Sequence, residues 1–383
     1  MTAPELETSS AEERTLRESV REFALEEILP RVRELEHAKR LPPELFRKLG
    51  EMGLLAMIYP EAYGGAGMDY RLMAASIEEL ARVCPGAALS VAATNSLAAG
   101  QIFLFGTEEQ RLRWMPGIAS GAKTASWGLT EPDAGSDSFR LASRAERAPG
   151  GWILNGRKSL ITHASFCDLA VVMAMTDAGS GRDGITAFVV ERGMKGFESG
   201  KTEEKLGMCA SDTGDLVFRD CFVPDANVVG APGMGGRHAL GVLDGGRIGI
   251  AALAVGLAQG AMDASIAYAH QREQFGRPIA QFQAIQFKIA DMATKIHAAR
   301  LMVERAAAVK ESTGKSGHDG SMAKLFASEI SVQVAEEAIQ IHGGYGYTKD
   351  FLVEKYWRDS KLLTIGEGTS EVQRLIIAKH MLA

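Results

Sequence analysis

The chain has 383 residues, of which 46% are hydrophobic and 23% charged, an ordinary composition for a globular protein with two or three domains. Its formal net charge of −6, without a long run of lysine or arginine, argues against nonspecific binding to nucleic acid or to a membrane surface. The four cysteines, Cys84, Cys167, Cys209 and Cys221, lack CxxC spacing and are expected to be reduced thiols.

Sequence signals for export, metal binding and serine hydrolysis are missing. Residues 1–30 are acidic and polar, without the basic and apolar regions of a signal peptide, and we expect no segment apolar and long enough to cross a bilayer. The eight histidines form no cluster of metal-ligand spacing, and no GxSxG motif is present. We therefore expect a cytoplasmic protein without a metal site.

The first third, residues 1–123, is predicted to be helical. Ser10 and Glu13 have capping-box spacing and precede an apolar face that Pro30 should interrupt. Three further helical segments are predicted at 41–55, 70–83 and 87–105.

Residues 124–229 are predicted to form a small antiparallel β domain. Short β-rich runs occur at 152–154, 169–175, 185–190 and 216–222. Turn residues separate these runs at 150–151, 155–156 and 181–184, as hairpin connections would.

Helical periodicity returns in residues 230–383. One long helix is predicted to begin near Arg247, and a second carries apolar residues from Met322 to Ile330. The fold class predicted is therefore α+β and mainly α, with an N-terminal helical domain, a central antiparallel β domain and a C-terminal helical domain.

The segment LLTIGEGTSEVQRL, residues 362–375, holds a candidate general base. Glu367 lies between Gly366 and Gly368, so no neighbouring side chain would block its approach to a ligand. Alternatively, Glu367 is only a loop residue before a helix, since Ser370 and Gln373 have capping-box spacing.

Four other stretches are candidate binding segments, each with a structural alternative. The turn-rich residues 125–138, with Thr130 and Ser136, suit a phosphate or the polar edge of a flavin, or are a simple loop. Thr162 in KSLITH is a second candidate hydroxyl or a satisfied strand-end threonine. Residues 268–283, with Arg272, suit a nucleotide, or end a helix at a glycine. Residues 340–347 either cap a helix or approach a cofactor.

Seven stretches in this order resemble the acyl-CoA dehydrogenase family along nearly the whole chain. They are PEAYGGAGMD, LTEPDAGSD, LITH, LDGGRIGIA, REQFGRPIAQFQ, QIHGGYGY and IGEGTSEVQR. The resemblance implies a helical, a β and a four-helix domain with FAD at their junction. It also implies a homotetramer, built as a pair of dimers, in which each FAD contacts two subunits.

The resemblance assigns residues to the two ligands. FAD is expected to contact Leu129, Thr130, Gly135, Ser136, Thr162, Arg272, Phe275, Gln283, Gln340, Gly343, Gly344, Thr369 and Glu371, with the residues from Arg272 to Gly344 acting across a dimer interface. The acyl-CoA substrate is expected to contact Ser136, Asp244, Arg247 and Gly368.

Glu367 matches the family's catalytic glutamate. The resemblance implies that it removes the α-proton of the acyl thioester while the β-hydrogen leaves as hydride to flavin N5, and that its backbone N–H helps to hold the thioester carbonyl. Some members carry the base immediately before the arginine that corresponds to Arg247, but that position here is Gly246. The base is therefore assigned to Glu367.

Two residues depart from the family's pattern. Leu160 stands where many members have tryptophan beside the flavin, and Gly366 stands where many have an aromatic residue before the glutamate. The second change is expected to widen the pocket near the thioester.

The function that the resemblance implies is FAD-dependent conversion of a short- or medium-chain, possibly branched, acyl-CoA to trans-2-enoyl-CoA. An electron-transfer flavoprotein would reoxidise the enzyme. Two alternatives stay open: an oxygen-reacting, acyl-CoA oxidase-like flavoenzyme, and a noncatalytic helical scaffold.

Overall fold

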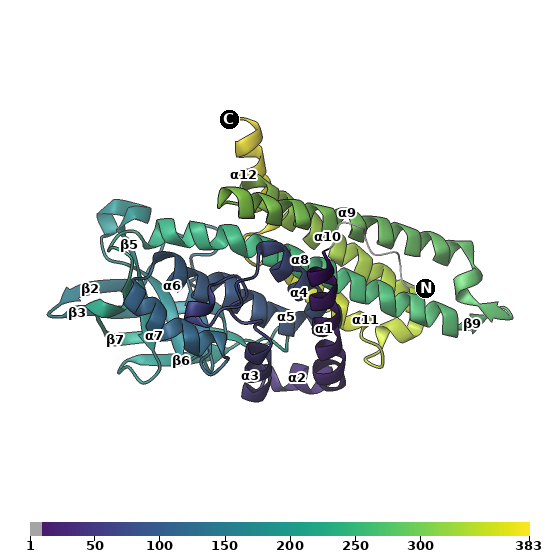
Figure 1. Cartoon of the computed structure of the whole chain (residues 1–383), viewed down its shortest axis with the longest axis horizontal. Coiled ribbons are helices and arrows are strands. Elements are labelled where there is room, and N and C mark those ends of the chain that lie inside the picture. Colours follow the sequence, from purple (N-terminus) through teal and green to yellow (C-terminus); the bar gives the residue numbers. More distant parts are fainter. Residues whose placement is uncertain (1–9) are drawn as a thin grey trace.

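The computed structural model describes residues 10–383, which form a helical N-terminal part, a β-sheet and a long helical C-terminal part (Figure 1). The N-terminal helices are α1 (Ala11–Phe23), α2 (Val32–Ala38), α3 (Pro43–Glu51), α4 (Tyr70–Val83), α5 (Pro85–Ala93), α6 (Ala99–Phe105) and α7 (Glu108–Ala119). A π-helical turn, Ala24–Ile28, follows α1, and a second one, Thr94–Ala98, joins α5 to α6.

Side-chain caps fix where several of these helices begin. The Ser10 hydroxyl accepts a hydrogen bond from the Glu13 backbone N–H (3.1 Å), as predicted. Helix α7 was not predicted, although Thr107 and Gln110 form a reciprocal capping box at its start. The first helix also differs from the prediction, because regular α-helix ends at Phe23 and a π-helical turn precedes Pro30.

The central part is one eight-stranded sheet. Its strands are β1 (Ala125–Gly128), β2 (Arg144–Ala148), β3 (Gly151–Thr162), β4 (Leu169–Met175), β5 (Ile185–Glu191), β6 (Phe197–Thr202), β7 (Thr213–Pro224) and β8 (Val228–Val229). They pair in the order β6-β7-β3-β2-β4-β5-β8, and β1 pairs with β4.

The sheet corrects the prediction of a purely antiparallel domain at two points. Strands β1 and β2 both run parallel to β4. The residues Asn155 and Gly156, predicted to connect two strands, instead lie inside β3 at a shift in its register with β7. Gly156 has φ +150°, and a side chain there would run into Ser143, so the glycine serves a β-bulge and not a hairpin turn.

The C-terminal part consists of long helices around α8 (Gly235–Gln271). After a hairpin of β9 (Glu273–Gln274) and β10 (Arg277–Pro278) come α9 (Gln283–Thr313), α10 (Gly317–His342), α11 (Val353–Leu363) and α12 (Ser370–Met381). Helix α8 was predicted from its apolar periodicity to begin near Arg247, but it begins at Gly235. Tertiary packing overrides the poor helix propensity of glycine here, since several of these glycines lie against neighbouring chain.

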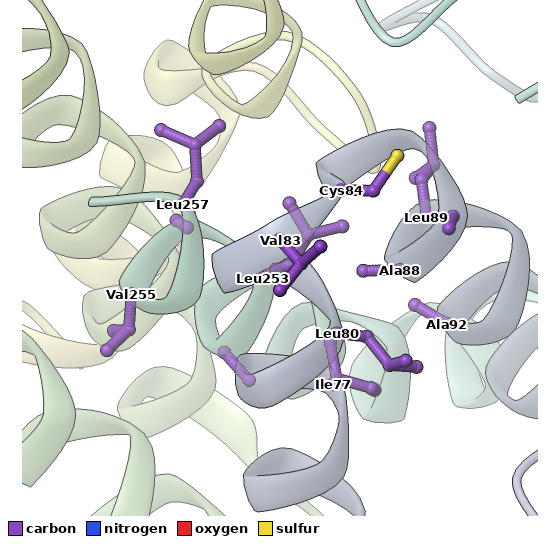
Figure 2. Close-up of a cluster of buried hydrophobic side chains, with 14 of the residues drawn as sticks. Ile77, Leu80, Val83, Cys84, Ala88, Leu89, Ala92, Leu253, Val255 and Leu257 are labelled. Carbon is purple, nitrogen blue, oxygen red and sulfur yellow. The ribbon is translucent and has the colours of Figure 1, made fainter. Parts of the chain in front are cut away.

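One hydrophobic core joins the N-terminal and C-terminal helices. It runs from Val20 in α1 to Leu363 in α11, and Figure 2 shows part of it, where α4 and α5 meet α8. Side chains such as Leu80 from α4 and Leu253 from α8 are fully buried there. The two helical segments that flank the sheet in sequence therefore stabilise each other in space.

Two helical stretches are apolar and long enough to span a membrane, contrary to our expectation. They are Pro85–Phe105 and Gly235–Gln271, and 72% of the most apolar window of each is buried within the protein. Their apolar composition reflects their central position, because helices covered on all sides need no polar face.

Gly256 on α8 allows the close approach of α4, which gives a stability prediction. A Cβ at this position would lie 2.9 Å from the Ala81 Cβ and even closer to the Glu78 carbonyl. Gly256→Ala should therefore lower the free energy of unfolding by about 1–3 kcal/mol, despite the better helix propensity of alanine. Urea unfolding would measure this. Gly249→Ala on the same helix is the matched control, because its Cβ would meet side chains only at 3.5–3.7 Å; equal losses in both variants would contradict the packing explanation.

Candidate active site

Glu367 lies in the turn between α11 and α12. Gly366 N–H donates to the Leu362 carbonyl (2.8 Å), and Ser370 N–H donates to the Thr364 carbonyl (3.0 Å), which close the turn. Glu367 itself has φ +53°, a left-handed conformation that costs a non-glycine residue about 1–3 kcal/mol. Such a cost is tolerated where the surrounding structure fixes a functional side chain.

The predicted helix cap at Ser370 is wrong by one residue. Thr369 is the N-cap, and its hydroxyl accepts a hydrogen bond from the Val372 backbone N–H (3.3 Å). Ser370 is the first helical residue, and the Gln373 side chain instead donates to the carbonyls of Glu367 (3.2 Å) and Gly368 (3.1 Å). Glu367 is therefore left free of any capping role.

The Glu367 carboxylate points at Gly246 on α8. A Cβ at position 246 would lie 3.0 Å from the Glu367 Cδ and closer still to Oε2, so only glycine leaves room for the carboxylate. The residue as a whole is half-buried, yet its Oε2 atom is buried and has no hydrogen-bond partner within the described residues. The carboxylate of Glu367 thus lies against the position on α8, Gly246, at which some members of the family carry their base.

Burial raises the pKa of Glu367 to about 7, although Lys324 and Arg247 both favour its ionised form. A carboxylate with a proton affinity near neutrality suits general acid–base chemistry, because it can accept a proton and still be ionised at working pH. The same burial lowers the pKa of Lys324 to about 8 and lowers that of Arg247. The site is thus a buried carboxylate with two cationic neighbours.

Asp244 and Arg247, both predicted to contact the substrate, lie on α8 beside this carboxylate. Asp244 accepts hydrogen bonds from Lys310 Nζ (3.0 Å), from the backbone of Ser316 (2.8 Å) and from that of Gly317 (2.9 Å), so it fixes the start of α10. The Arg247 guanidinium is 3.9 Å from the Asp244 carboxylate, and within the described part of the chain its buried Nε has no hydrogen-bond partner. Arg247 therefore keeps a free donor for a ligand, whereas the Asp244 carboxylate is already occupied.

The loop 129–136, predicted to line FAD, is anchored by a buried ion pair. Lys158 Nζ lies 2.6 Å from Glu131 Oε1 and donates to the Leu129 carbonyl (3.2 Å), and both side chains are almost fully buried. The backbone N–H of Ser159 donates to the Thr130 carbonyl (2.9 Å). Gly135 and Ser136, at the tip, remain exposed and available.

Polar atoms without partners occur next to this loop. Within the described residues, the Trp127 indole N–H and the Ser159 hydroxyl are buried and make no hydrogen bond. Thr162 ends β3 close by, and Leu160 is 62% exposed with φ +59°. An exposed leucine in a left-handed conformation and two unpartnered polar groups therefore lie close to the loop 129–136.

The predicted FAD residues from Arg272 to Gly344 lie at the opposite end of the molecule, whereas Thr369 and Glu371 lie at the start of α12, next to Glu367. The β9–β10 hairpin is far from the sheet in Figure 1, and the Phe275 ring at its tip is 94% exposed. A pocket of about 630 Å³ lies elsewhere, near Trp152, but a second one of about 500 Å³ is lined by Arg272, Gly343 and Gly344. One chain therefore does not bring Arg272 and Gly344 together with Thr130 and Thr162.

The structural alternative predicted for each of these distant segments is present at Gly343 and absent at Gly276. Helix α10 ends at His342, with Gly343 as its C-cap at φ +59°, as the capping interpretation predicted. Gly276 does not end a helix, because α8 stops at Gln271 and Gly276 lies in the β9–β10 turn at φ +75°. Gln283 and Gln340 are both exposed.

Sequence reasoning missed Lys324. It is fully buried on α10, and its ammonium group donates to the Gly368 carbonyl (2.7 Å) next to the candidate base. The one sequence signal was weak: Lys324 shares helical spacing with the small residues Gly320, Ser328 and Ser331, a face that can pack closely. Glu131 and Lys158 were also missed, because in the sequence each looks like an ordinary charged residue of the surface.

The four cysteines are free, and three of them are buried. Within residues 10–383, no group of three or more histidine, cysteine, aspartate or glutamate side chains is placed to hold a metal ion.

A buried carboxyl oxygen of raised proton affinity, with no hydrogen-bond partner within residues 10–383, lies where the helical segments meet, an arrangement suited to general-base chemistry. Sequence models of the acyl-CoA dehydrogenase N-terminal, middle and C-terminal domains match residues 10–122, 126–221 and 233–382. The chain belongs to the acyl-CoA dehydrogenase family, a family of flavoproteins, and is an enzyme of that type.

Named relatives agree with this membership. The probable acyl-CoA dehydrogenase YngJ of Bacillus subtilis strain 168 is 45% identical over 374 residues, which cover 97% of this chain and 98% of that protein. Butyryl-CoA dehydrogenase from Megasphaera elsdenii superposes with a TM-score of 0.94 at 39% identity, covering 98% of this chain and 99% of that chain. A chain in a structure described as the electron transferring flavoprotein of Acidaminococcus fermentans superposes with a TM-score of 0.96 at 42% identity, with coverage of 98% and 99%.

Proposed function

We propose that this enzyme oxidises a short acyl-CoA to the trans-2-enoyl-CoA, with Glu367 as the base that removes the α-proton. The observation that carries the proposal is the Glu367 carboxylate, which lies against Gly246, whose buried Oε2 has no hydrogen-bond partner within residues 10–383, and whose pKa is raised to about 7. The preference for a short chain is supported by the likeness to a butyryl-CoA dehydrogenase.

Glu367 accepts the α-proton on its carboxylate, which must be ionised when the substrate arrives. The Glu367 backbone N–H, in the left-handed turn, donates to the thioester carbonyl and stabilises the charge that develops there. Arg247 lies along the substrate and can use its unpartnered Nε. The bound acyl chain excludes water from the buried carboxylate, which keeps its proton affinity high.

The residues of the chain fit a flavin. The buried, unpartnered Trp127 and Ser159 groups lie by the loop 129–136 and Thr162, which would hold the isoalloxazine end of FAD. A side chain at Gly343 or Gly344 would meet open space, so the pocket beside Arg272 has room for the end of FAD opposite the isoalloxazine. FAD, when bound, supplies the acceptor for the β-hydrogen as hydride.

A dimer completes the cofactor site in this proposal. Because the β9–β10 hairpin lies far from the sheet, whose strands β1 and β2 flank the loop 129–136, the residues from Arg272 to Gly344 would contact the FAD of a second copy. A pair of such dimers gives the homotetramer implied by the family resemblance. We further propose an electron-transfer flavoprotein as the acceptor of the electrons.

Anaerobic titration with butyryl-, hexanoyl-, octanoyl- and isobutyryl-CoA tests the proposal. We expect the flavin absorbance to bleach, with butyryl-CoA acting at the lowest concentration. Bleaching by none of the four would contradict acyl-CoA oxidation, and a colourless protein would favour the noncatalytic scaffold. Turnover with oxygen as fast as with an electron-transfer flavoprotein would favour the oxidase-like alternative.

A further inference from the structure

A buried cation holds the turn that carries Glu367. Lys324 projects from α10, is fully buried, and donates from Nζ to the Gly368 carbonyl at 2.7 Å. Burying a lysine among apolar neighbours is costly unless its charge has a use or a partner. The hydrogen bond here goes to a neutral carbonyl, so it does not by itself account for a charged group at this position.

A neutral side chain makes the same contact from another helix. Gln373 on α12 donates from Nε2 to the Gly368 carbonyl (3.1 Å) and to the Glu367 carbonyl (3.2 Å). Two donors from two helices therefore fix the same peptide segment. Only Lys324 carries a charge. Variants of the two residues can therefore distinguish the effect of holding the Gly368 carbonyl in place from the effect of the charge.

The charged groups near Lys324 come from each helix packed around the turn. They are Glu367 in the turn, Arg247 on α8, Glu329 on α10 itself and Glu371 on α12. Arg247 has its own carboxylate partner in Asp244, and Glu329 is paired with Arg374 (2.6 Å). Of the two remaining carboxylates, that of Glu371 is exposed, whereas the Oε2 atom of Glu367 is buried and has no hydrogen bond within the described part of the chain.

We propose that Lys324 is a positioning residue for the catalytic base: it anchors the Gly368 carbonyl and, through its charge, keeps the Glu367 carboxylate ionised until the substrate binds. Without this cation, a carboxylate enclosed without hydrogen bonds would take up a proton and could not act as a base. This proposal rests on the proposed role of Glu367, yet it concerns a protonation equilibrium that exists without turnover.

Infrared titration of the purified protein tests the proposal independently of activity. The carboxylic-acid stretching band that Glu367→Gln removes reports the protonated fraction of Glu367 as pH is varied. In Lys324→Met the midpoint should rise by about one to three pH units, the usual effect of losing a nearby opposite charge. Gln373→Leu removes the neutral donor to the same carbonyl. Its titration midpoint should differ from that of the wild type by less than half of the rise seen in Lys324→Met.

Two outcomes would overturn the proposal: an unchanged midpoint in Lys324→Met, or an equal rise in Gln373→Leu. If Lys324→Met does not fold, Lys324→Gln keeps a donor for the Gly368 carbonyl while removing the charge, and it should show the same rise. If the titration shifts as expected but no acyl-CoA bleaches the flavin, the proposed reaction fails while the role of Lys324 stands.

Discussion

Glu367→Gln should reduce flavin bleaching by a short acyl-CoA by about 10²–10⁴-fold, the usual contribution of a positioned general base. The amide has nearly the shape of the carboxylate and fits the space beside Gly246, but it cannot accept the α-proton. Stopped-flow measurement of the bleaching rate under anaerobic conditions would give the effect.

The same variant should keep its fold and its ligands. The pKa of Glu367 is raised from 4.5 to about 7 in the folded protein, so the folded state loses stability relative to the unfolded state as pH rises through this interval. The uncharged glutamine escapes this loss, and above pH 7 the variant should melt no lower than the wild type. A variant that bleaches at the wild-type rate would remove Glu367 from the mechanism, and one that no longer binds FAD would leave its role as a base unsupported.

Gly246→Ala should reduce the bleaching rate by about 10²-fold without unfolding the protein, because displacing a catalytic group by about 1 Å has effects of this size. The new methyl group would lie 3.0 Å from the Glu367 Cδ and closer to Oε2, so the carboxylate must move. Single-turnover bleaching with butyryl-CoA would measure the change.

Gly249→Ala is the control, three residues along α8. Its Cβ meets Ile77 and Ala92 at ordinary contact distances, so bleaching should proceed at the wild-type rate. If Gly246→Ala were as active as this control, the carboxylate would have another position available, and the pairing of Gly246 with Glu367 would not constrain the base.

The sequence allowed the helical and β segments to be recognised where local pattern and tertiary environment agree. The predicted segments at 70–83 and 169–175 coincide with α4 and β4, because their apolar residues are both periodic and buried. The start of α8 and the parallel pairings of β4 depend on contacts between distant segments, which no local window contains. Gly156 was misread for that reason, since glycine in a bulge and glycine in a turn look alike in sequence.

Only part of the candidate site was predictable, because contacts between residues far apart in the sequence form only on folding. Glu367 and Gly246 were assigned from the family resemblance, but their direct contact is a feature of the folded chain. Lys324 acts only through the turn that it meets on folding, 44 residues further along the chain. Buried charges such as Lys158 and Lys324 are hard to find in sequence because lysine is usually exposed.

The single core shared by the first and last helices has a consequence for folding during synthesis. Val20 and Leu363 belong to one buried cluster, so the apolar faces of α1 and α4 have no complete cover until most of the chain has left the ribosome. At about 5–20 residues per second, that delay lasts on the order of tens of seconds. The β-sheet, whose strands all lie between residues 125 and 229, can pair in the meantime, while the earliest helices keep apolar surface uncovered until α8 is synthesised.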